Sequence, residues 1–562
     1  MNTEAHFSSS TDGFPAGQPA SGSARTGIPE LPADLPACHA LICELLERLA
    51  EKHRDQERLE HQIQHLLRRL YGRSSERLDD EDMVLFRDLM DQLVPKPAPA
   101  PASTPEPVAA PTSKDSNAGR HQHGRERIPG SLPRQEIIHD LSEEEKRCPG
   151  CGRIRCMIGR EISEQYDYVP PKVTVLQHVQ LKYACKACDQ DARGARITLS
   201  QKPLAPVEKG LAAPGLLAHV VVSKYGDHLP MYRMESILER SGLRLSRSTL
   251  CDWAAQTAAA LKPLYERMHD RLLESAVIHT DDTPVDALEP KTGGRHTGRF
   301  WVYVGDAQNP YCLFDYTASR SRDGPMAFLG DWSGYLQADA FSGYDGIYLG
   351  RTGGRVVEVA CWAHARRKFY DARTTDPPTS TRALAYIRLL YDVEDQIRQG
   401  ELDAPERASR RQAQAQPRLT EFKEWLGRLG RENGGHVMPK SPMGEAVGYA
   451  LNQWDALNVY LTDGRLSIDN NVAENALRRV ALGRKNWLFV GSDNGGRTAA
   501  VLYSLISSCK RHKVEPWTYL RDVLTRIPLI STQGQLDDLL PDRWQTLREK
   551  EKENKKTERA AP

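Results

Sequence analysis

A short apolar run that leads into two acidic residues constrains this fold most. Ala276–Ile278 predicts a buried strand, and Asp281 and Asp282 follow before Thr283-Pro284, which should end the strand. A carboxylate at the tip of a buried strand is held rigidly and is still accessible, which suits a divalent metal. An aspartate before Thr-Pro can equally be a turn residue that bonds its own backbone.

Two later segments carry acids in comparable positions. Residues 334–344 form a second short run that reaches Asp339, and residues 467–479 open a helix with Glu474 in its first turn. Asn471-x-x-Glu474 also fits a helix-capping pattern, which would make Glu474 a cap partner. Between the two aspartates, the sequence predicts strands over 299–304 and 311–316 and a short helix over 323–331.

The order of these elements indicates a multidomain α/β chain with a ribonuclease-H-like core. It runs strand with Asp281, two strands, helix, strand with Asp339 and, much later, helix with Glu474. Three oxygen ligands from separate elements suit Mg²⁺ or Mn²⁺, and two such ions could clamp the attacking and leaving oxygens of a phosphodiester. The distance in sequence from Asp339 to Glu474 predicts a helical insertion over 375–458.

Basic and hydroxyl residues near these acids and at helix starts are candidates for DNA contact. A strand is predicted over 356–361, followed by a basic helix over 362–373, and 494–497 predicts a backbone-rich turn that could hold a phosphate. A solvated helix face is the alternative for most of these charges. The candidates are Arg247, Ser248, His364, Arg366, Arg367, Lys368, Arg478, Arg484, Lys485 and Arg497.

Two CxxC pairs predict a structural zinc site. Cys148 with Cys151 and Cys185 with Cys188 would supply four thiolates for tetrahedral Zn²⁺. The alternating pattern over 172–183 predicts a hairpin between the two pairs. Redox or chance pairs are the alternative, and the spare donors Cys156 and His178 lack the paired spacing.

Helical patterns precede and follow the zinc region. A helix ending at Gly242 and another starting at Ser246 have helix-turn-helix spacing, although an N-cap on an ordinary helical hairpin would look the same. Residues 34–77 predict a helix with a heptad seam from Ile42 to Leu70. That seam fits a coiled coil, or an amphipathic helix packed on its own protein.

Bulk composition excludes several classes of protein. The chain has 562 residues, too many for one core, and its net charge of +1 leaves nucleic-acid affinity to local basic patches. No apolar run is long enough to span a membrane, and the N-terminus lacks the blocks of a secretory signal. Eleven cysteines, four of them in CxxC pairs, indicate metal binding in a reducing cytoplasm.

Four segments together resemble the IS66 family of transposases: HTDDTPV, LQADAFSGYDG, CWAHARRKF and DNNVAENALRRVALGRKNWLFVGSDNGG. The resemblance covers nearly the whole chain and implies that Asp281, Asp339 and Glu474 are the catalytic acids. The family usually has Glu after its first Asp, where this chain has Asp282.

The resemblance implies a D-D-E transposase in a bacterial cytoplasm, associated with the nucleoid. Water would attack the phosphodiester at the element's end with the help of Mg²⁺ or Mn²⁺, and the freed 3′-hydroxyl would attack target DNA. The implied partners are the element's terminal inverted repeats, target DNA, further copies of the chain joined through the N-terminal helix, and small accessory proteins. Two alternatives stay open: a non-catalytic zinc and helix-turn-helix regulator, and a nuclease without strand transfer.

The predicted organisation then follows the chain in order. It comprises a disordered segment 1–33, a helical leucine-zipper-like region 34–93, a proline-rich linker 94–132, a zinc-binding domain 133–195, a helix-turn-helix-like region 205–268, a catalytic domain 272–498, a C-terminal helical segment 499–545 and a charged, disordered tail 546–562.

Overall fold

In the computed structural model, the chain forms two compact units. The described residues are 34–36, 38–49, 51–52, 173–184, 197–199, 204–207, 210–339, 344–349, 356–430 and 434–560. The larger unit comprises Arg87–His364, Tyr386–Leu419 and Asn452–Pro562, and the smaller comprises Met1–Phe86, Ala365–Ala385 and Thr420–Leu451. None of the described helices is long and apolar enough to cross a membrane.

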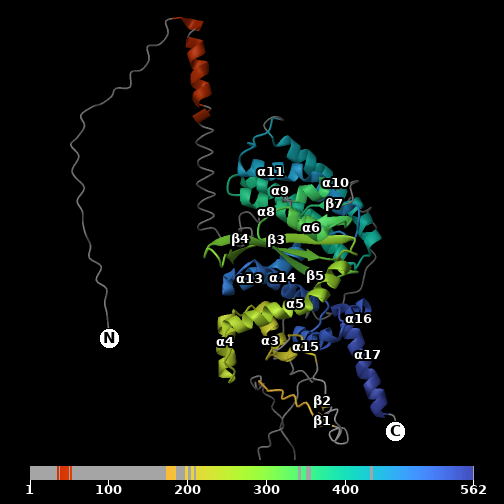
Figure 1. Ribbon diagram of the computed structural model, residues 1–562. Coiled ribbons are helices and arrows are strands. Elements are labelled where there is room, and N and C mark those ends of the chain that lie inside the picture. Colours follow the sequence, from red (N-terminus) through yellow and green to blue (C-terminus); the bar gives the residue numbers. More distant parts are fainter. Residues whose placement is uncertain are drawn as a thin grey trace, which may run out of the picture. The chain divides into compact units, whose positions relative to one another are not determined.

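A six-stranded mixed sheet forms the centre of the larger unit (Figure 1). Its strand order is β5-β4-β3-β6-β7, with β8 beside the far part of β3. Strands β3, β4 and β5 run antiparallel, whereas β6 and β8 are parallel to β3, and β7 is parallel to β6. The strands are β3 Val277–Leu288, β4 Arg295–Val304, β5 Cys312–Thr317, β6 Gly334–Gln337, β7 Val356–Val359 and β8 Phe489–Val490.

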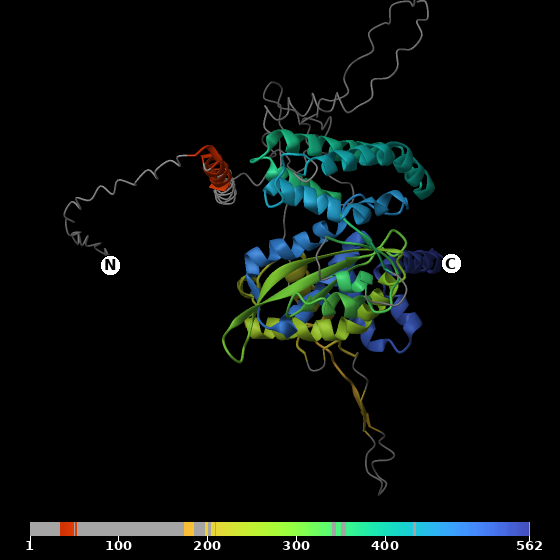
Figure 2. The same cartoon turned by 90° about the horizontal axis from the view of Figure 1, so that it is seen from above.

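The first acidic strand is longer than predicted. The prediction that Thr283-Pro284 ends it was wrong, because β3 runs on to Leu288 and pairs with β4 from His279 to Leu288, with Pro284 opposite Arg299. On its other edge, among the residues that the structure describes, β3 pairs with β6 up to His279 and with β8 from Asp286. Pro284 lies between these two ladders, where a proline is tolerated. The resulting β3–β4 hairpin extends beyond the short strands (Figure 2).

Two helices cover one face of the sheet and bury its apolar strands. Helix α13, Asn471–Trp487, packs on β3 and β4, and α14, Asp493–Arg511, packs on β5 (Figure 1). Serine side chains of α14 bond backbone groups of the edge strand β5. Ser504 Oγ accepts Phe314 N–H at 2.7 Å, and Ser508 Oγ accepts Cys312 N–H at 3.1 Å. These bonds protect an edge that would otherwise be open.

The helices before the sheet share its hydrophobic core. Helix α4, Met231–Arg240, is followed by the left-handed Gly242 (φ +84°), and α5, Arg247–Leu272, begins after Ser246, whose hydroxyl accepts Thr249 N–H. The two predicted helices and the short turn between them are therefore confirmed, and the Ser246 cap fits an ordinary helical hairpin as well as a helix-turn-helix. The buried residues of α5 belong to the same core as the sheet, and α5 packs against α14. Helix α3, Pro214–Val221, continues into a π-helical turn, Val222–Gly226.

The C-terminal elements differ from two predictions. Residues 494–497 are not a turn but the first turn of α14, whose N-cap is Ser492. The tail was expected to be disordered, yet α17, Pro541–Ala560, is helical, and alternating Glu and Lys support such a helix. The helices α15 Pro516–Arg526 and α16 Gln533–Asp537 precede it, with the 3₁₀ turn Ile527–Leu529 between them.

The segment between β7 and α13 is helical, as predicted. Its helices are α8 Trp362–Ala372, α9 Pro377–Gln399, α10 Ala404–Arg428, α11 Pro442–Asn452 and α12 Trp454–Asn458, followed by the 3₁₀ turn Val459–Leu461. Two short helices, α6 Asp323–Leu329 and α7 Asp345–Leu349, lie earlier in the chain. Within the smaller unit, Phe422 packs between Phe369 and Trp425.

Three predictions near the N-terminus are only partly covered by the described residues. Residues 35–36, 38–49 and 51–52 are helical, in agreement with the N-terminal helix. In the hairpin predicted over 172–183, the described residues form a strand only from Lys182, where β1, Lys182–Ala184, pairs with β2, Ile197–Leu199. Residues 1–33 and 94–132 lie outside the described part of the chain.

Candidate active site

Three adjacent elements bring the three predicted acids together. Asp281 lies on β3, Asp339 follows its parallel neighbour β6, and Glu474 is in the first turn of α13, which packs on β3. Burial, followed by the charge of Asp339 and more weakly those of Asp282 and Glu474, raises the pKa of Asp281 to about 7. The charges of Asp339 and Glu474 therefore act on Asp281, and a divalent cation beside these acids would neutralise them.

The raised pKa of Asp281 predicts a pH dependence for metal binding. Because its pKa of about 7 lies above the ordinary 3.8, folding favours the protonated form, and the stability that this proton contributes is lost as the pH rises through 7. A cation needs the ionised form, so its affinity should rise by up to about tenfold per pH unit below 7 and level off above. Mn²⁺ titrations at about pH 6 and about pH 8 check this; equal affinities would contradict it.

Asp282 has a structural role on the opposite face of β3. Its buried carboxylate accepts hydrogen bonds from Arg299 Nη1 at 2.8 Å and from Arg320 Nε and Nη2 at 3.0 and 2.8 Å. Arg320 Nη2 also lies 3.9 Å from Asp339 Oδ2. Asp282 therefore holds the Arg320 guanidinium beside Asp339. The sequence did not indicate this role.

Replacing Asp282 by asparagine should lower the free energy of unfolding by about 1–3 kcal/mol. The change removes the charge that binds Arg299 and Arg320, but both arginines are partly exposed and can regain water. Chemical unfolding of Asp282→Asn beside Asp282→Glu, which keeps the charge, measures the effect. Equal losses in both variants would show that shape, rather than charge, matters at this position.

Two buried amides fix the start of α13 against the sheet. Asn470, the N-cap residue, donates from Nδ2 to the Thr280 carbonyl at 2.8 Å, and its Oδ1 lies 3.1 Å from His279 Nδ1. Gln337 on β6 donates to the carbonyls of Ser467 and Asp469 at 2.7 and 3.1 Å. The capping alternative for Glu474 was wrong, because Asn470, not Asn471, precedes the helix and its side chain bonds β3 instead.

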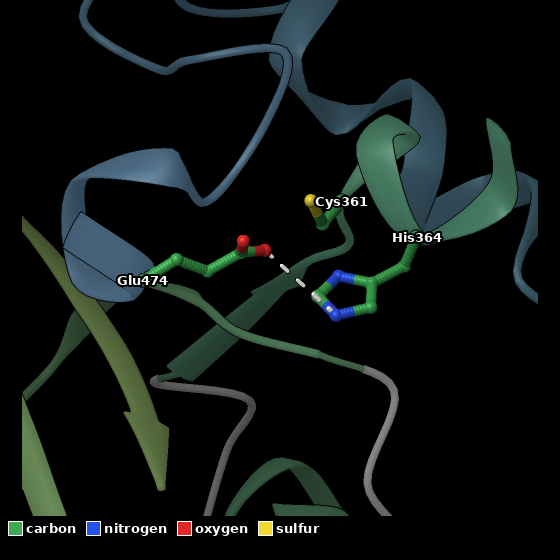
Figure 3. Close-up of side chains that lie close together, drawn as sticks. All are labelled: Cys361, His364 and Glu474. Carbon is green, nitrogen blue, oxygen red and sulfur yellow. Dashed lines mark ion pairs between the residues drawn. The ribbon is translucent and has the colours of Figure 1, made fainter. Parts of the chain in front are cut away.

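His364 and Cys361 lie beside Glu474, and Figure 3 shows the three side chains close together, with Glu474 reaching toward His364. His364 Nε2 is 3.8 Å from Glu474 Oε1. The Cys361 sulfur accepts Asn470 N–H at 3.2 Å, which connects the start of α8 to the start of α13. Burial raises the pKa of the Cys361 thiol to about 12, so the metal-free protein carries the thiol.

The DNA-contact candidates on α13 and α14 differ in their exposure and in the bonds that they make within the protein. Arg484 donates to Thr283 Oγ1 at 2.9 Å and to the Pro284 carbonyl, so it lies against β3 near Asp281. Arg478 and Lys485 are exposed on α13. Arg497 is exposed on α14 and donates to Asn494 Oδ1 at 2.8 Å.

The remaining candidates lie elsewhere. Arg247 and Ser248 are exposed at the start of α5, where Arg247 lies 3.6 Å from Glu235 and Ser248 bonds the capping Ser246. Arg366, Arg367 and Lys368 belong to the smaller unit, and the Lys368 ammonium lies over the Tyr449 ring. The four predicted zinc ligands, Cys148, Cys151, Cys185 and Cys188, lie outside the described residues.

Comparison with known proteins identifies related sequences along most of the chain. Residues 209–498 match the family described as "Transposase IS66 family". Further matches are "IS66 C-terminal element" over 504–541, "zinc-finger binding domain of transposase IS66" over 145–189 and "Transposase C of IS166 homeodomain" over 58–137. The second CxxC pair, like the first, falls inside the zinc-finger match.

Three uncharacterized proteins of Sinorhizobium fredii are similar over most of their length. y4jD is 32% identical over 456 residues, which cover 78% of this chain and 87% of that protein. y4qI is 34% identical over 418 residues (72% and 75%), and y4hP is 31% identical over 471 residues (79% and 82%).

Proposed function

Since this chain belongs to the IS66 transposase family, we propose that it is a metal-dependent transposase that cuts DNA at the ends of its element and joins them to target DNA. Family membership implies the use of a divalent metal, binding of zinc and DNA as a partner.

The strand order supports a ribonuclease-H-like core. Three antiparallel strands are followed by a helix and two parallel strands, and the helix that carries Glu474 comes much later in the chain. This is the order that the sequence predicted for such a core. It pairs the end of β6 with His279, two residues before Asp281 on β3.

The observation that carries the proposal is that Asp281, Asp339 and Glu474 come from three packed elements and that the charges of Asp339 and Glu474 act on Asp281. Asp281 and Asp339 would hold the cations, and Glu474 would complete the second site. Their all-oxygen donor set fits Mg²⁺ or Mn²⁺, which when bound would stabilise the charge on the attacking and leaving oxygens. Arg484, held against β3, would hold a DNA phosphate next to these acids.

The other regions would bring DNA to this site. The zinc-finger region and the exposed start of α5 would recognise the element's ends, and the N-terminal helix would pair copies of the chain. Accessory proteins from the same element would be further partners.

Product analysis tests the function. Purified full-length protein is incubated with labelled element-end DNA, a target plasmid and Mg²⁺ or Mn²⁺, with scrambled-end DNA as the matched control. The proposal expects joined products that depend on the true ends and on the metal. Cleavage without joining would favour a nuclease, and binding without any metal-dependent chemistry would favour a regulator.

A further inference from the structure

Cys361, His364 and Glu474 place a sulfur, a nitrogen and an oxygen donor within 4.8 Å of one another. Figure 3 shows the imidazole edge facing both the carboxylate and the thiol. His364 Nδ1 is buried and has no hydrogen-bond partner among the described residues. An orphaned ring nitrogen in a cluster of metal-binding groups points to a missing ligand.

The local fold fixes the three donors independently of any ion. Cys361 directly precedes α8, and its sulfur is anchored by Asn470 N–H at 3.2 Å. His364 lies three residues later, so one helical turn brings its ring to the same side. Asn470 is also the residue before α13, so the same bond sets the position of the turn that carries Glu474.

We propose that Cys361, His364 and Glu474 bind a zinc-class divalent cation. Mixed sulfur, nitrogen and oxygen donors suit Zn²⁺ and are a poor set for Mg²⁺. On binding, the thiol proton passes to solvent and the thiolate bonds the ion, while three protein ligands leave a fourth position for water. The cluster is open to solvent on one side, since the His364 and Glu474 side chains are 27% and 32% exposed.

The consequence for activity rests on the function proposed above. When Glu474 binds the zinc-class ion, its carboxylate is turned toward His364. It then cannot also bind the catalytic cations held by Asp281 and Asp339. Zn²⁺ would therefore inhibit the Mg²⁺-dependent reaction, and this cluster would be the inhibitory site.

Zinc content tests the site without any DNA chemistry. Full-length protein is equilibrated with buffered free Zn²⁺, and bound zinc is measured in the wild type, Cys361→Ser, His364→Gln and the control Cys148→Ser/Cys151→Ser. Cys361→Ser and His364→Gln should each bind about one zinc per chain less than the wild type. Any zinc that the control loses belongs to the predicted CxxC site and is counted separately. Equal zinc content in the wild type and both variants would overturn the proposal. His364→Gln carries the test if Cys361→Ser fails to fold.

Zinc titration of DNA cleavage tests the consequence. The cleavage rate of each protein is compared with its own rate without added zinc. The zinc concentration that halves this rate should be at least about tenfold higher for Cys361→Ser than for the wild type. Equal inhibition of wild type and Cys361→Ser would overturn the inhibitory role. If no protein cleaves DNA, the proposed transposase function fails, while the zinc content still decides whether the site exists.

Discussion

Asp281→Asn is expected to reduce metal-dependent DNA cleavage by at least about a thousandfold. Burial and neighbouring acids raise the pKa of Asp281, which lies on β3 two residues beyond its last pair with the parallel strand β6. Asparagine keeps the shape but removes the charge that would hold the cation. Initial cleavage rates on element-end DNA, at saturating Mg²⁺, measure the loss.

The same substitution should stabilise the protein in the absence of metal. Above about pH 7 the wild type carries a carboxylate that its neighbours repel, so Asn should raise the unfolding temperature by roughly 2–4 °C. Asp286→Asn is the matched control, because Asp286 lies exposed on the same strand. An Asp281→Asn protein that cleaves like this control would contradict the assignment of Asp281.

Arg411→Ala is expected to lower the free energy of unfolding by about 3–5 kcal/mol. Arg411 is almost fully buried in α10 and bonds both oxygens of Glu394 on α9 at 2.8 Å. It also donates to the carbonyls of Tyr460, Leu466 and Asp463 at 2.9, 3.1 and 3.3 Å. Alanine would leave a buried carboxylate and three carbonyls unpaired, and chemical unfolding measures the cost.

Two further variants decide whether pairing explains that loss. Arg410→Ala changes the neighbouring, partly exposed residue and should cost less than about 1 kcal/mol. The double variant Glu394→Ala/Arg411→Ala should lose less than the sum of the two single variants, because the first change already removes the pair. Additive losses would show that the ion pair contributes little.

The order of elements around the acids was predictable because it depends on local patterns. Apolar runs predicted β4 and β5, and polarity with turn residues predicted the first turn of α13, which contains Glu474. Predictions from the sequence failed where pairing with residues distant in the chain determines the bounds of an element. Pro284 does not end β3 because β4 pairs along its whole length and the opposite edge at that point is free of strand partners among the described residues.

The supporting residues of the candidate site could not be predicted for the same reason. Cys361 looked unsuited to metal binding as a CxxH pair alone, since its third partner, Glu474, comes more than one hundred positions later. Asn470 and Gln337 carry no charge or spacing signal, and only the packing of α13 on β3 reveals their bonds. Asp282 differs from Asp281 only in the face of β3 that it occupies.

Mn²⁺ binding to the full-length protein tests the central claim most directly, because the claim is that Asp281, Asp339 and Glu474 act as one cation site. Binding is measured without DNA at about pH 8 in the wild type, Asp281→Asn, Asp339→Asn, Glu474→Gln and the control Asp286→Asn. Each of the three substitutions should weaken binding at least about tenfold, while the control binds like the wild type. Wild-type affinity in any of the three would contradict a shared site.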